Sequence, residues 1–209
     1  MGSAPIEDRH RCSMPFPVRA ILIMLDIRWP ALWQWLRTYG KTILLTAVVV
    51  FFVRWKVVEP FYIPSASMEP TLKRLDRILV NKVTYHIEKP QRWDVLVFKN
   101  PQDHRQNFVK RIVGLPGETL WIQNGEVYIN GVKQEKPDQI HAVFYTDVGR
   151  WGTLEPVRIP SDCYFVLGDN SERSKDSRWW ENGPFVTEDE IIGEAVTIIW
   201  PPERMRLIR

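Results

Sequence analysis

Two serines, Ser65 and Ser67, lie between two prolines in residues 63–70 (IPSASMEP). A serine hydroxyl becomes a useful nucleophile when a nearby base takes its proton. Proline restricts the backbone on both of its sides, so a hydroxyl in this segment can be held in one orientation. The segment is therefore a candidate nucleophile loop, although an ordinary turn rich in serine and proline has the same composition.

Lys110 lies between Phe108 and Ile112 in a run with the composition of a β-strand. Side chains alternate along a strand, so these three share one face. If that face is buried, loss of water disfavours the ammonium and lowers the pKa of Lys110, as a lysine base requires. At a pKa near 10.4 only about 0.04% of lysine is neutral at pH 7, and lowering it by about three costs about 4 kcal/mol. A lysine that reaches solvent needs no such change, and the pattern allows both.

Residues 168–178 (GDNSERSKDSR) place hydroxyls and charges directly after an apolar run. Such a loop can supply a hydroxyl that orients a lysine and an Asp176–Arg178 pair that fixes the loop, or it can be a solvated turn. Other catalytic patterns are missing from the sequence: there is no zinc-binding helix motif, phosphate-binding loop or dinucleotide fingerprint. The four histidines are scattered and are interpreted as surface or loop residues: His10, His86, His104 and His141.

The elements that must position these groups are mostly strands. After Pro60, short apolar runs alternate with Gly, Pro and Asn, which is typical of an antiparallel β domain. We expect hairpin turns at Asn124-Gly125 and Asn130-Gly131. The stretch 133–158 reads as an extended insertion or loose hairpin. Strands are expected over 78–85, 95–98, 108–113, 119–123, 126–129, 163–167 and 191–200.

The apolar run at 42–53 has no charge but is twelve residues long. That is about 18 Å of helix, against a hydrocarbon core of about 30 Å. Basic and aromatic flanks extend it, since they suit the two membrane interfaces. We therefore expect a tail over 1–36, a membrane anchor over 37–58 and a β domain over 59–209, with a buried soluble helix as the alternative for the apolar run. Four tryptophans should lie at the interfaces, outside the β core: Trp29, Trp33, Trp35 and Trp55.

Composition excludes several protein classes. The chain has 209 residues, 44% hydrophobic and 25% charged content, and a net charge of +3. Its mean hydropathy is −0.24. These values exclude a polytopic membrane protein, a coiled coil and a disordered chain. The positive excess lies in the first 41 residues, so the remaining chain is neutral and gives no reason to expect a nucleic-acid-binding face.

Together and in this order, the three chemical segments resemble those of the type I signal peptidases, membrane-bound serine proteases of peptidase family S26 that use a Ser-Lys dyad. The matching segments are PSASMEPTL, KRIVGLPGE and GDNSERSKDSR. The resemblance covers the anchor and nearly all of residues 59–199, with Ala66, Trp93 and Glu118 at positions where the family more often has other residues. It implies a mainly β fold, an open antiparallel sheet or partial barrel like that of the SOS repressors, preceded by one transmembrane helix.

The resemblance also implies roles for individual residues. Ser67 would be the nucleophile and Lys110 its general base, while Ser65 and the Ser67 amide would bind the oxyanion. Ser174 would hydrogen-bond and orient Lys110, with Asp176, Ser177 and Arg178 as supporting residues. Shallow apolar pockets for small substrate residues would be lined or bordered by Phe61, Ile63, Pro64, Met68, Leu72 and Val109.

The implied activity is endoproteolysis that removes N-terminal signal peptides from secreted precursors after small residues, of the Ala-x-Ala type, without a metal or other cofactor. Its partners would be preprotein signal peptides, the lipid bilayer and the secretion translocon, with no nucleic acid. The implied location is the bacterial cytoplasmic (inner) membrane, single-pass with a cytoplasmic N-terminus. Two alternatives are a Ser-Lys maturation peptidase with a narrow substrate and a catalytically silent, membrane-tethered peptide-binding β domain.

Overall fold

The computed structural model describes residues 29–208, which begin with the helix α2 (Trp29–Lys56). Pro30 suits the first turn of a helix, and Arg54 and Lys56 suit the negative end of the helix dipole. Within α2, the 22 residues Trp33–Arg54 have a mean hydropathy of 1.5 and are long and apolar enough to cross a membrane. The helix begins before the predicted anchor 37–58 and ends sooner, because residue 58 already belongs to a strand.

Four tryptophans in this region are predicted to lie at the membrane interfaces, outside the β core. The side chains of Trp33 and Trp35 are exposed, and neither packs in the β core. The side chains of Trp29 and Trp55 lie outside the described set, as does His10 in the N-terminal tail.

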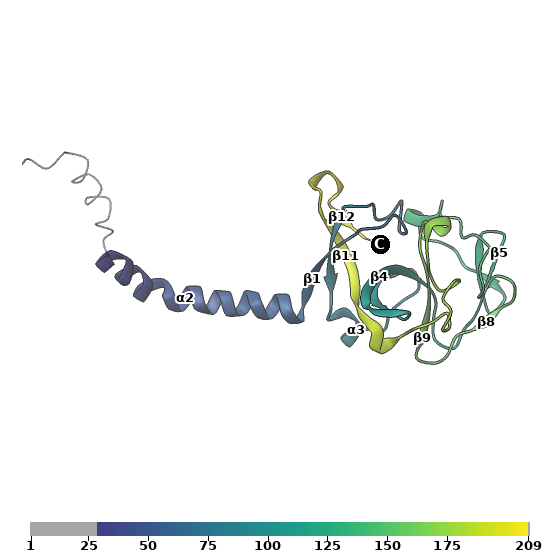
Figure 1. Ribbon diagram of the computed structural model, residues 1–209, viewed down its shortest axis with the longest axis horizontal. Coiled ribbons are helices and arrows are strands. Elements are labelled where there is room, and N and C mark those ends of the chain that lie inside the picture. The colour runs from purple at the N-terminus through teal and green to yellow at the C-terminus, as the bar shows by residue number, and fades with distance from the viewer. Residues whose placement is uncertain (1–28, 209) are drawn as a thin grey trace, which may run out of the picture. The chain divides into compact units, whose positions relative to one another are not determined.

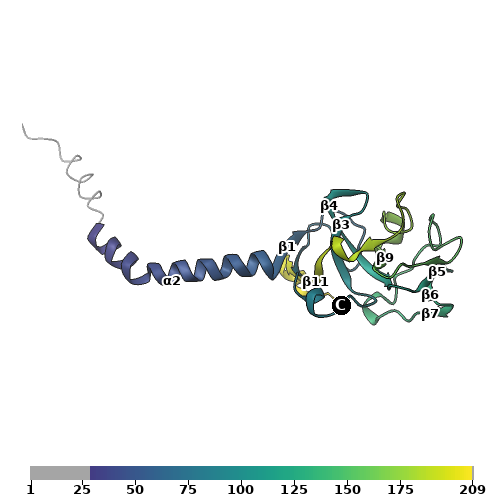
Figure 2. The ribbon, with the colours of Figure 1, turned by 90° about the horizontal axis from the view of Figure 1, so that it is seen from below.

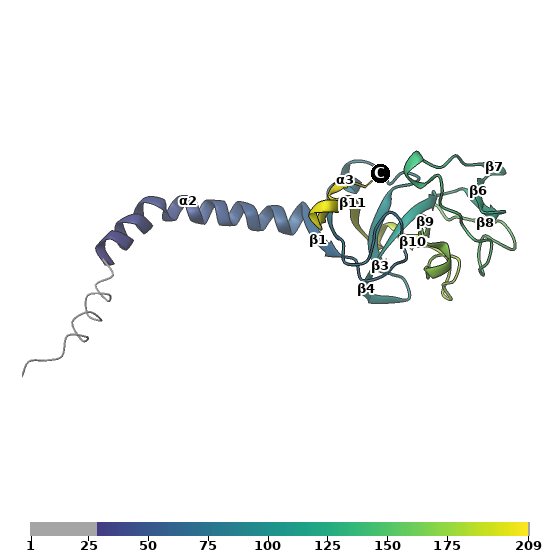
Figure 3. The ribbon, with the colours of Figure 1, turned by 90° about the horizontal axis from the view of Figure 1, so that it is seen from above.

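The larger of the two sheets in the described chain has eight strands in the order β1-β2-β11-β3-β4-β9-β10, with β12 paired to β11. Figure 1 shows β11 in yellow with β12 beside it, and Figure 3 shows β9 next to β10. All its pairings are antiparallel, as the sequence predicts. Its strands are β1 (Val58–Tyr62), β2 (Arg77–Asn81), β3 (Val95–Asn100), β4 (Asp103–Gly114), β9 (Cys163–Leu167), β10 (Val186–Thr187), β11 (Ile191–Trp200) and β12 (Arg206–Leu207).

The smaller sheet has the order β7-β6-β5-β8, and Figure 2 shows β5, β6 and β7 together. The hairpin between β5 and β6 turns at Asn124 and Gly125, both at positive φ, which confirms the predicted turn. Asn130 and Gly131 also have positive φ and turn the chain from β6 into β7. The strands are β5 (Thr119–Gln123), β6 (Glu126–Ile129), β7 (Val132–Lys133) and β8 (Val157–Arg158).

The first strand was not expected from the sequence, because Pro60 lies in its middle. Proline has no N–H to donate and is therefore excluded from central strands. Strand β1 lies at the edge of the larger sheet and pairs with β2 alone, with Pro60 opposite Leu79. An edge position tolerates the missing donor, and the strand carries the chain directly toward Ser67.

One further prediction was wrong. The strand expected over 78–85 ends at Asn81, whose side-chain oxygen accepts the Val83 N–H and turns the chain into the short helix α3 (Thr84–Ile87). The stretch 133–158 has little regular secondary structure, and its residues Ile140, Val143 and Tyr145 are buried in a core cluster with the smaller sheet. Short 3₁₀ turns occur at η1 (Asp138–Ile140), η2 (Ser171–Arg173), η3 (Glu188–Glu190) and η4 (Pro202–Arg204).

Strand β3 is buried on both faces. Val95 and Val97 join a core cluster with the residues around Ser67, whereas Leu96 and Phe98 join a second cluster on the opposite face. Two-sided burial explains why this run is continuously apolar. Strand β4 lies between β3 and β9 in the sheet, and its last five residues, 110–114, are buried, so a lysine at position 110 has little access to water.

Candidate active site

The loop between β1 and β2 carries both candidate serines. Ile63, Met68 and Leu72 of this loop are buried in the core cluster of β2, β3 and β11, so the segment between them has little freedom. Ser67 is 7% exposed, whereas Ser65 is exposed. The backbone is fixed at this point because the Asn170 N–H donates to the Ser67 carbonyl over 3.0 Å.

Strand β4 carries Lys110, which lies directly opposite Leu96 of β3. Its ammonium donates a 2.7 Å hydrogen bond to Ser67 Oγ, across 43 residues of sequence. The same nitrogen lies 5.5 Å from the centre of the Phe108 ring. Phe108 and Ile112 belong to one buried cluster, so the alternation read from the sequence places Lys110 on an apolar face.

The pKa of Lys110 follows from this burial. The side chain is 4% exposed, and desolvation lowers its pKa to about 8, although the carboxylates of Asp176 and Asp169 act in the opposite direction. At that pKa about a tenth of the lysine is neutral at pH 7, compared with about 0.04% for a lysine in water. The deprotonated amine can then accept the proton of the Ser67 hydroxyl.

One buried ion pair joins two of the three chemical segments. Arg111 follows Lys110 in β4 and points to the opposite face, where it donates to both carboxylate oxygens of Asp169 over 2.8 and 2.7 Å. The same carboxylate accepts a hydrogen bond from the hydroxyl group of Thr71, four residues after Ser67. The sequence analysis assigned no role to Arg111, Asp169 or Thr71. Their positions inside the three matching segments were the feature of the sequence that could have indicated a role in the site.

A second buried ion pair fixes the loop after β9. Arg178 donates to both oxygens of Asp176 over 2.9 Å each, and both side chains are fully buried. Asp176 also accepts the Gly168 N–H over 3.0 Å. The Ser177 hydroxyl accepts the Val166 N–H over 3.0 Å, which ties the returning loop to β9. These contacts give Asp176, Ser177 and Arg178 positions that support the site without touching Ser67.

The two remaining hydroxyls have different surroundings. Ser65 Oγ lies 3.3 Å from Ser67 Oγ, which brings it within reach of an atom bonded to the nucleophile. Ser174 is 5% exposed, and its Oγ has no hydrogen-bond partner among the described residues. The hydrogen bond expected between Ser174 and Lys110 is therefore not formed in this structure.

Gly168, directly after β9, lies close to the Ser67 loop. A Cβ atom at this position would come within 3.0 Å of both Ser174 Oγ and the Ser67 carbonyl oxygen. The Ser67 carbonyl oxygen is a backbone atom, so it cannot move away from such a Cβ without displacing the chain. The absence of a side chain at Gly168 is thus what allows Ser174 and Ser67 to lie together.

Beside Ser67 and Lys110 is an open cavity of about 470 Å³, here named the catalytic cavity. Of the six residues expected to line or border substrate pockets, five line it, whereas Leu72 is fully buried beneath the loop and does not. The wall is largely apolar and contains both Ser65 and Ser67. It is formed by Phe61, Tyr62, Ile63, Pro64, Ser65, Ser67, Met68, Gln106, Asn107, Phe108, Val109, Lys110, Arg173 and Lys175.

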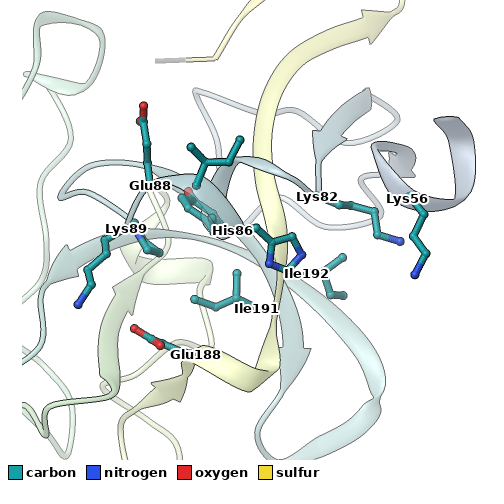
Figure 4. Close-up of a pocket in the computed structure, with 11 residues that line it drawn as sticks. Lys56, Lys82, His86, Glu88, Lys89, Glu188, Ile191 and Ile192 are labelled. Atoms are coloured by element: carbon teal, nitrogen blue, oxygen red, sulfur yellow. The ribbon is translucent and has the colours of Figure 1, made fainter.

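A separate hollow lies beside α3 and β11. Figure 4 shows Lys82 and His86 toward one side of it and Glu88 and Lys89 toward the other. It shares no lining residue with the catalytic cavity, and His86 is not among the residues that line that cavity. Within residues 29–208, no group of three or more His, Cys, Asp or Glu side chains is arranged to hold a metal ion.

Comparison with known proteins identifies signal peptidases by a family model and by individual relatives. The family model described as "Signal peptidase, peptidase S26" matches residues 36–200. The chain belongs to this family. Relatives include probable signal peptidase I-2 of Synechocystis sp., at 38% identity over 81% of this chain and 75% of the relative. Signal peptidase I of Leptolyngbya laminosa shares 39% identity over 79% and 80%, and that of Pseudomonas aeruginosa shares 35% over 80% and 74%.

Membership of the S26 signal peptidase family makes this chain a hydrolase that removes signal peptides. It also accounts for the mainly β architecture and for the apolar helix α2, which fits a membrane anchor. The named relatives are bacterial, and a membrane location follows from the family and the helix together.

Gly168→Ala should reduce signal peptidase activity by about 100-fold, because the added methyl group pushes Ser67 or Ser174 out of place. Cleavage of a precursor protein by purified enzyme in detergent measures the effect. Gly40→Ala is the matched control, since nothing lies within 4 Å of a Cβ at that position. Equal activity of Gly168→Ala and wild type would show that this close approach is unimportant.

Lys110→Met should change the dependence of stability on pH. Below about pH 8 both folded and unfolded wild type carry the proton, so the folded state bears the full desolvation cost; between about pH 8 and 10.4 the unfolded state binds more protons, and wild-type stability rises. The advantage of Lys110→Met in free energy of unfolding is then largest at pH 6–7, up to about 3 kcal/mol, and shrinks through that interval.

Denaturant unfolding of the full chain in micelles at pH 6, 8 and 10 measures this difference. Lys133→Met, at an exposed position in β7, controls for the loss of a lysine as such. A difference between wild type and Lys110→Met that stays constant with pH would contradict a lowered pKa.

Proposed function

We propose that Ser67 and Lys110 are the catalytic dyad with which this signal peptidase cleaves secretory precursors. The observation that carries the proposal is the 2.7 Å contact between Ser67 Oγ and the amine of a buried lysine whose pKa is lowered to about 8. A base needs a pKa near the working pH and hydrogen-bond contact with the proton it accepts. Lys110 has both.

Acylation begins when the neutral Lys110 amine accepts the proton of Ser67 as Oγ attacks the carbonyl carbon of the scissile bond. The negative charge that develops on the carbonyl oxygen is stabilised by hydrogen-bond donors already in place. Ser65 Oγ, 3.3 Å from Ser67 Oγ, and the Ser67 backbone N–H are the donors we assign to this oxyanion.

Collapse of the tetrahedral intermediate breaks the peptide C–N bond. The Lys110 ammonium gives its proton to the leaving amine, which departs as the N-terminus of the mature protein, while the signal peptide remains esterified to Ser67. A water molecule that loses a proton to Lys110 then attacks the ester. The proton passes to Ser67 Oγ as the signal peptide leaves with a free carboxylate, and the dyad returns to its starting state.

Specificity for small residues before the cut, of the Ala-x-Ala type, is the second part of the proposal. The catalytic cavity is open, and the side chains of its largely apolar wall include Ile63, Met68 and Val109. An apolar wall of this kind suits a methyl group and offers few partners to a polar or charged side chain.

We also propose that the N-terminus is cytoplasmic and that the β domain lies on the outer face of the cytoplasmic membrane. The sequence supports this orientation through its basic N-terminal tail. A precursor leaving the secretion translocon on that face would meet an enzyme confined to the same surface, which raises the effective concentration of both.

Ser67→Ala and Lys110→Met should each lower kcat by about 10³-fold or more on a precursor whose signal peptide ends in Ala-x-Ala, because either change removes one half of the proton transfer. For the wild type, kcat/KM should rise with pH through about 8 as Lys110 loses its proton. Ser161→Ala, at an exposed position outside the catalytic cavity, is the control. Full activity of either dyad variant would disprove the assignment.

Protease treatment of membrane vesicles tests the orientation. In sealed inside-out vesicles, with the cytoplasmic face outward, residues 59–209 should be protected until detergent is added, because the bilayer shields them. In spheroplasts the same residues should be digested. Digestion of the β domain in intact inside-out vesicles would reverse the proposed topology.

A further inference from the structure

A larger cavity adjoins the catalytic cavity. Its volume is about 950 Å³, within the range of sites that hold small ligands, and it is here named the Trp179 cavity. The two cavities share Gln106, Phe108, Arg173 and Lys175, so they meet beside the dyad. The Trp179 cavity is lined by Asn100, Gln102, Gln106, Phe108, Thr146, Val148, Ser171, Glu172, Arg173, Ser174, Lys175, Trp179, Trp180 and Glu181.

The wall of the Trp179 cavity contains one buried, tightly packed aromatic ring and one exposed aromatic ring. Trp180 is buried and packs edge-on against Phe98, with ring centres 6.0 Å apart, and its carbonyl accepts the indole N–H of Trp151. Trp179 is 46% exposed and Val148 is 60% exposed. Exposed aromatic and aliphatic groups beside a rigid wall are suited to bind the apolar parts of a peptide.

The charges where the cavities meet have one sign. The charged side chains lining the catalytic cavity are Lys110, Arg173 and Lys175, all of them cationic. Lys110 is the buried base, whereas Arg173 and Lys175 are exposed and have no part in the proposed proton transfer. Glu172 and Glu181 line the Trp179 cavity but not the catalytic cavity.

We propose that the Trp179 cavity binds the start of the mature protein, the segment that follows the scissile bond, and that Arg173 and Lys175 favour acidic side chains at its first two positions. The inference rests on the proposed function, in which the signal peptide side of the bond occupies the catalytic cavity. A peptide cut at Ser67 must continue beyond that cavity, and the shared wall opens into the Trp179 cavity.

Arg173 and Lys175 line the same cavity as Ser67, so their side chains border the space in which the scissile bond would lie. An extended chain advances about 3.3 Å per residue, so the first two mature residues remain within about 7 Å of that bond. Residues farther along the segment reach the half-exposed ring of Trp179.

Four precursors that differ only in charge test the proposal: Asp or Lys at the first two mature positions, and Asp or Lys at the second residue before the cut. Wild type should cleave the Asp mature form about fivefold faster in kcat/KM than the Lys form, a size typical of exposed charge pairs. The ratio should approach one in 1 M salt, where screening shortens to about 3 Å. Charge before the cut should have little effect.

Lys175→Glu should abolish or reverse this preference, and Arg173→Glu should weaken it. Lys133→Glu makes the same charge change outside both cavities and should leave the ratio unchanged. Trp179→Ala gives a second, uncharged readout. It should raise KM for a substrate with five mature residues while leaving a substrate with one mature residue unaffected.

The outcomes separate this inference from the proposed function. If Ser67→Ala is inactive but mature-side charge has no effect, or if charge before the cut governs the rate instead, the Trp179 cavity does not bind the mature segment. If Lys133→Glu changes the ratio as much as Lys175→Glu, the effect is one of net charge, and the local assignment is wrong. Cleavage by Ser67→Ala would overturn the dyad itself.

Discussion

The burial of Lys110 is the constraint on which the proposed active site depends. An ammonium in an apolar sheet carries a large desolvation cost, and this cost is what lowers its pKa toward the working range. Phe108 and Ile112 on the same face of β4, and Leu96 opposite Lys110 in β3, surround its side chain with apolar groups. The packing on this face of the sheet therefore produces the lowered pKa of Lys110.

Two buried ion pairs hold the neighbouring segments against that strand. Arg111 and Asp169 join β4 to the loop after β9, and Thr71 connects the same carboxylate to the Ser67 loop. Arg178 and Asp176 close the loop after β9 on itself. Loss of one partner of such a pair costs about 3–5 kcal/mol, because the other charge stays buried without compensation. The geometry of the dyad is thus set by residues that do not touch it.

Much of this arrangement could be predicted from the sequence. The features that could not be predicted depend on the position of a strand in the sheet or on tertiary packing. Alternation placed Lys110 between Phe108 and Ile112, and Asn124-Gly125 fixed a hairpin, because both are local rules. Strand β1 was missed because Pro60 argues against a strand unless its edge position is known. The Arg111–Asp169–Thr71 contacts were missed because they depend on tertiary packing. The lack of a hydrogen-bond partner for Ser174 Oγ among the described residues likewise depends on the conformation of the loop. A local sequence pattern does not determine that conformation.

The short connection between α2 and the catalytic loop has a consequence for the position of Ser67. Ser67 follows Lys56, the last residue of the helix, by eleven positions, five of which form strand β1. Even fully extended, that length of chain reaches about 35–40 Å. The connection therefore sets an upper limit on the distance between the end of the apolar helix and Ser67, and a proposed nucleophile so tethered cannot act far from that end of the helix.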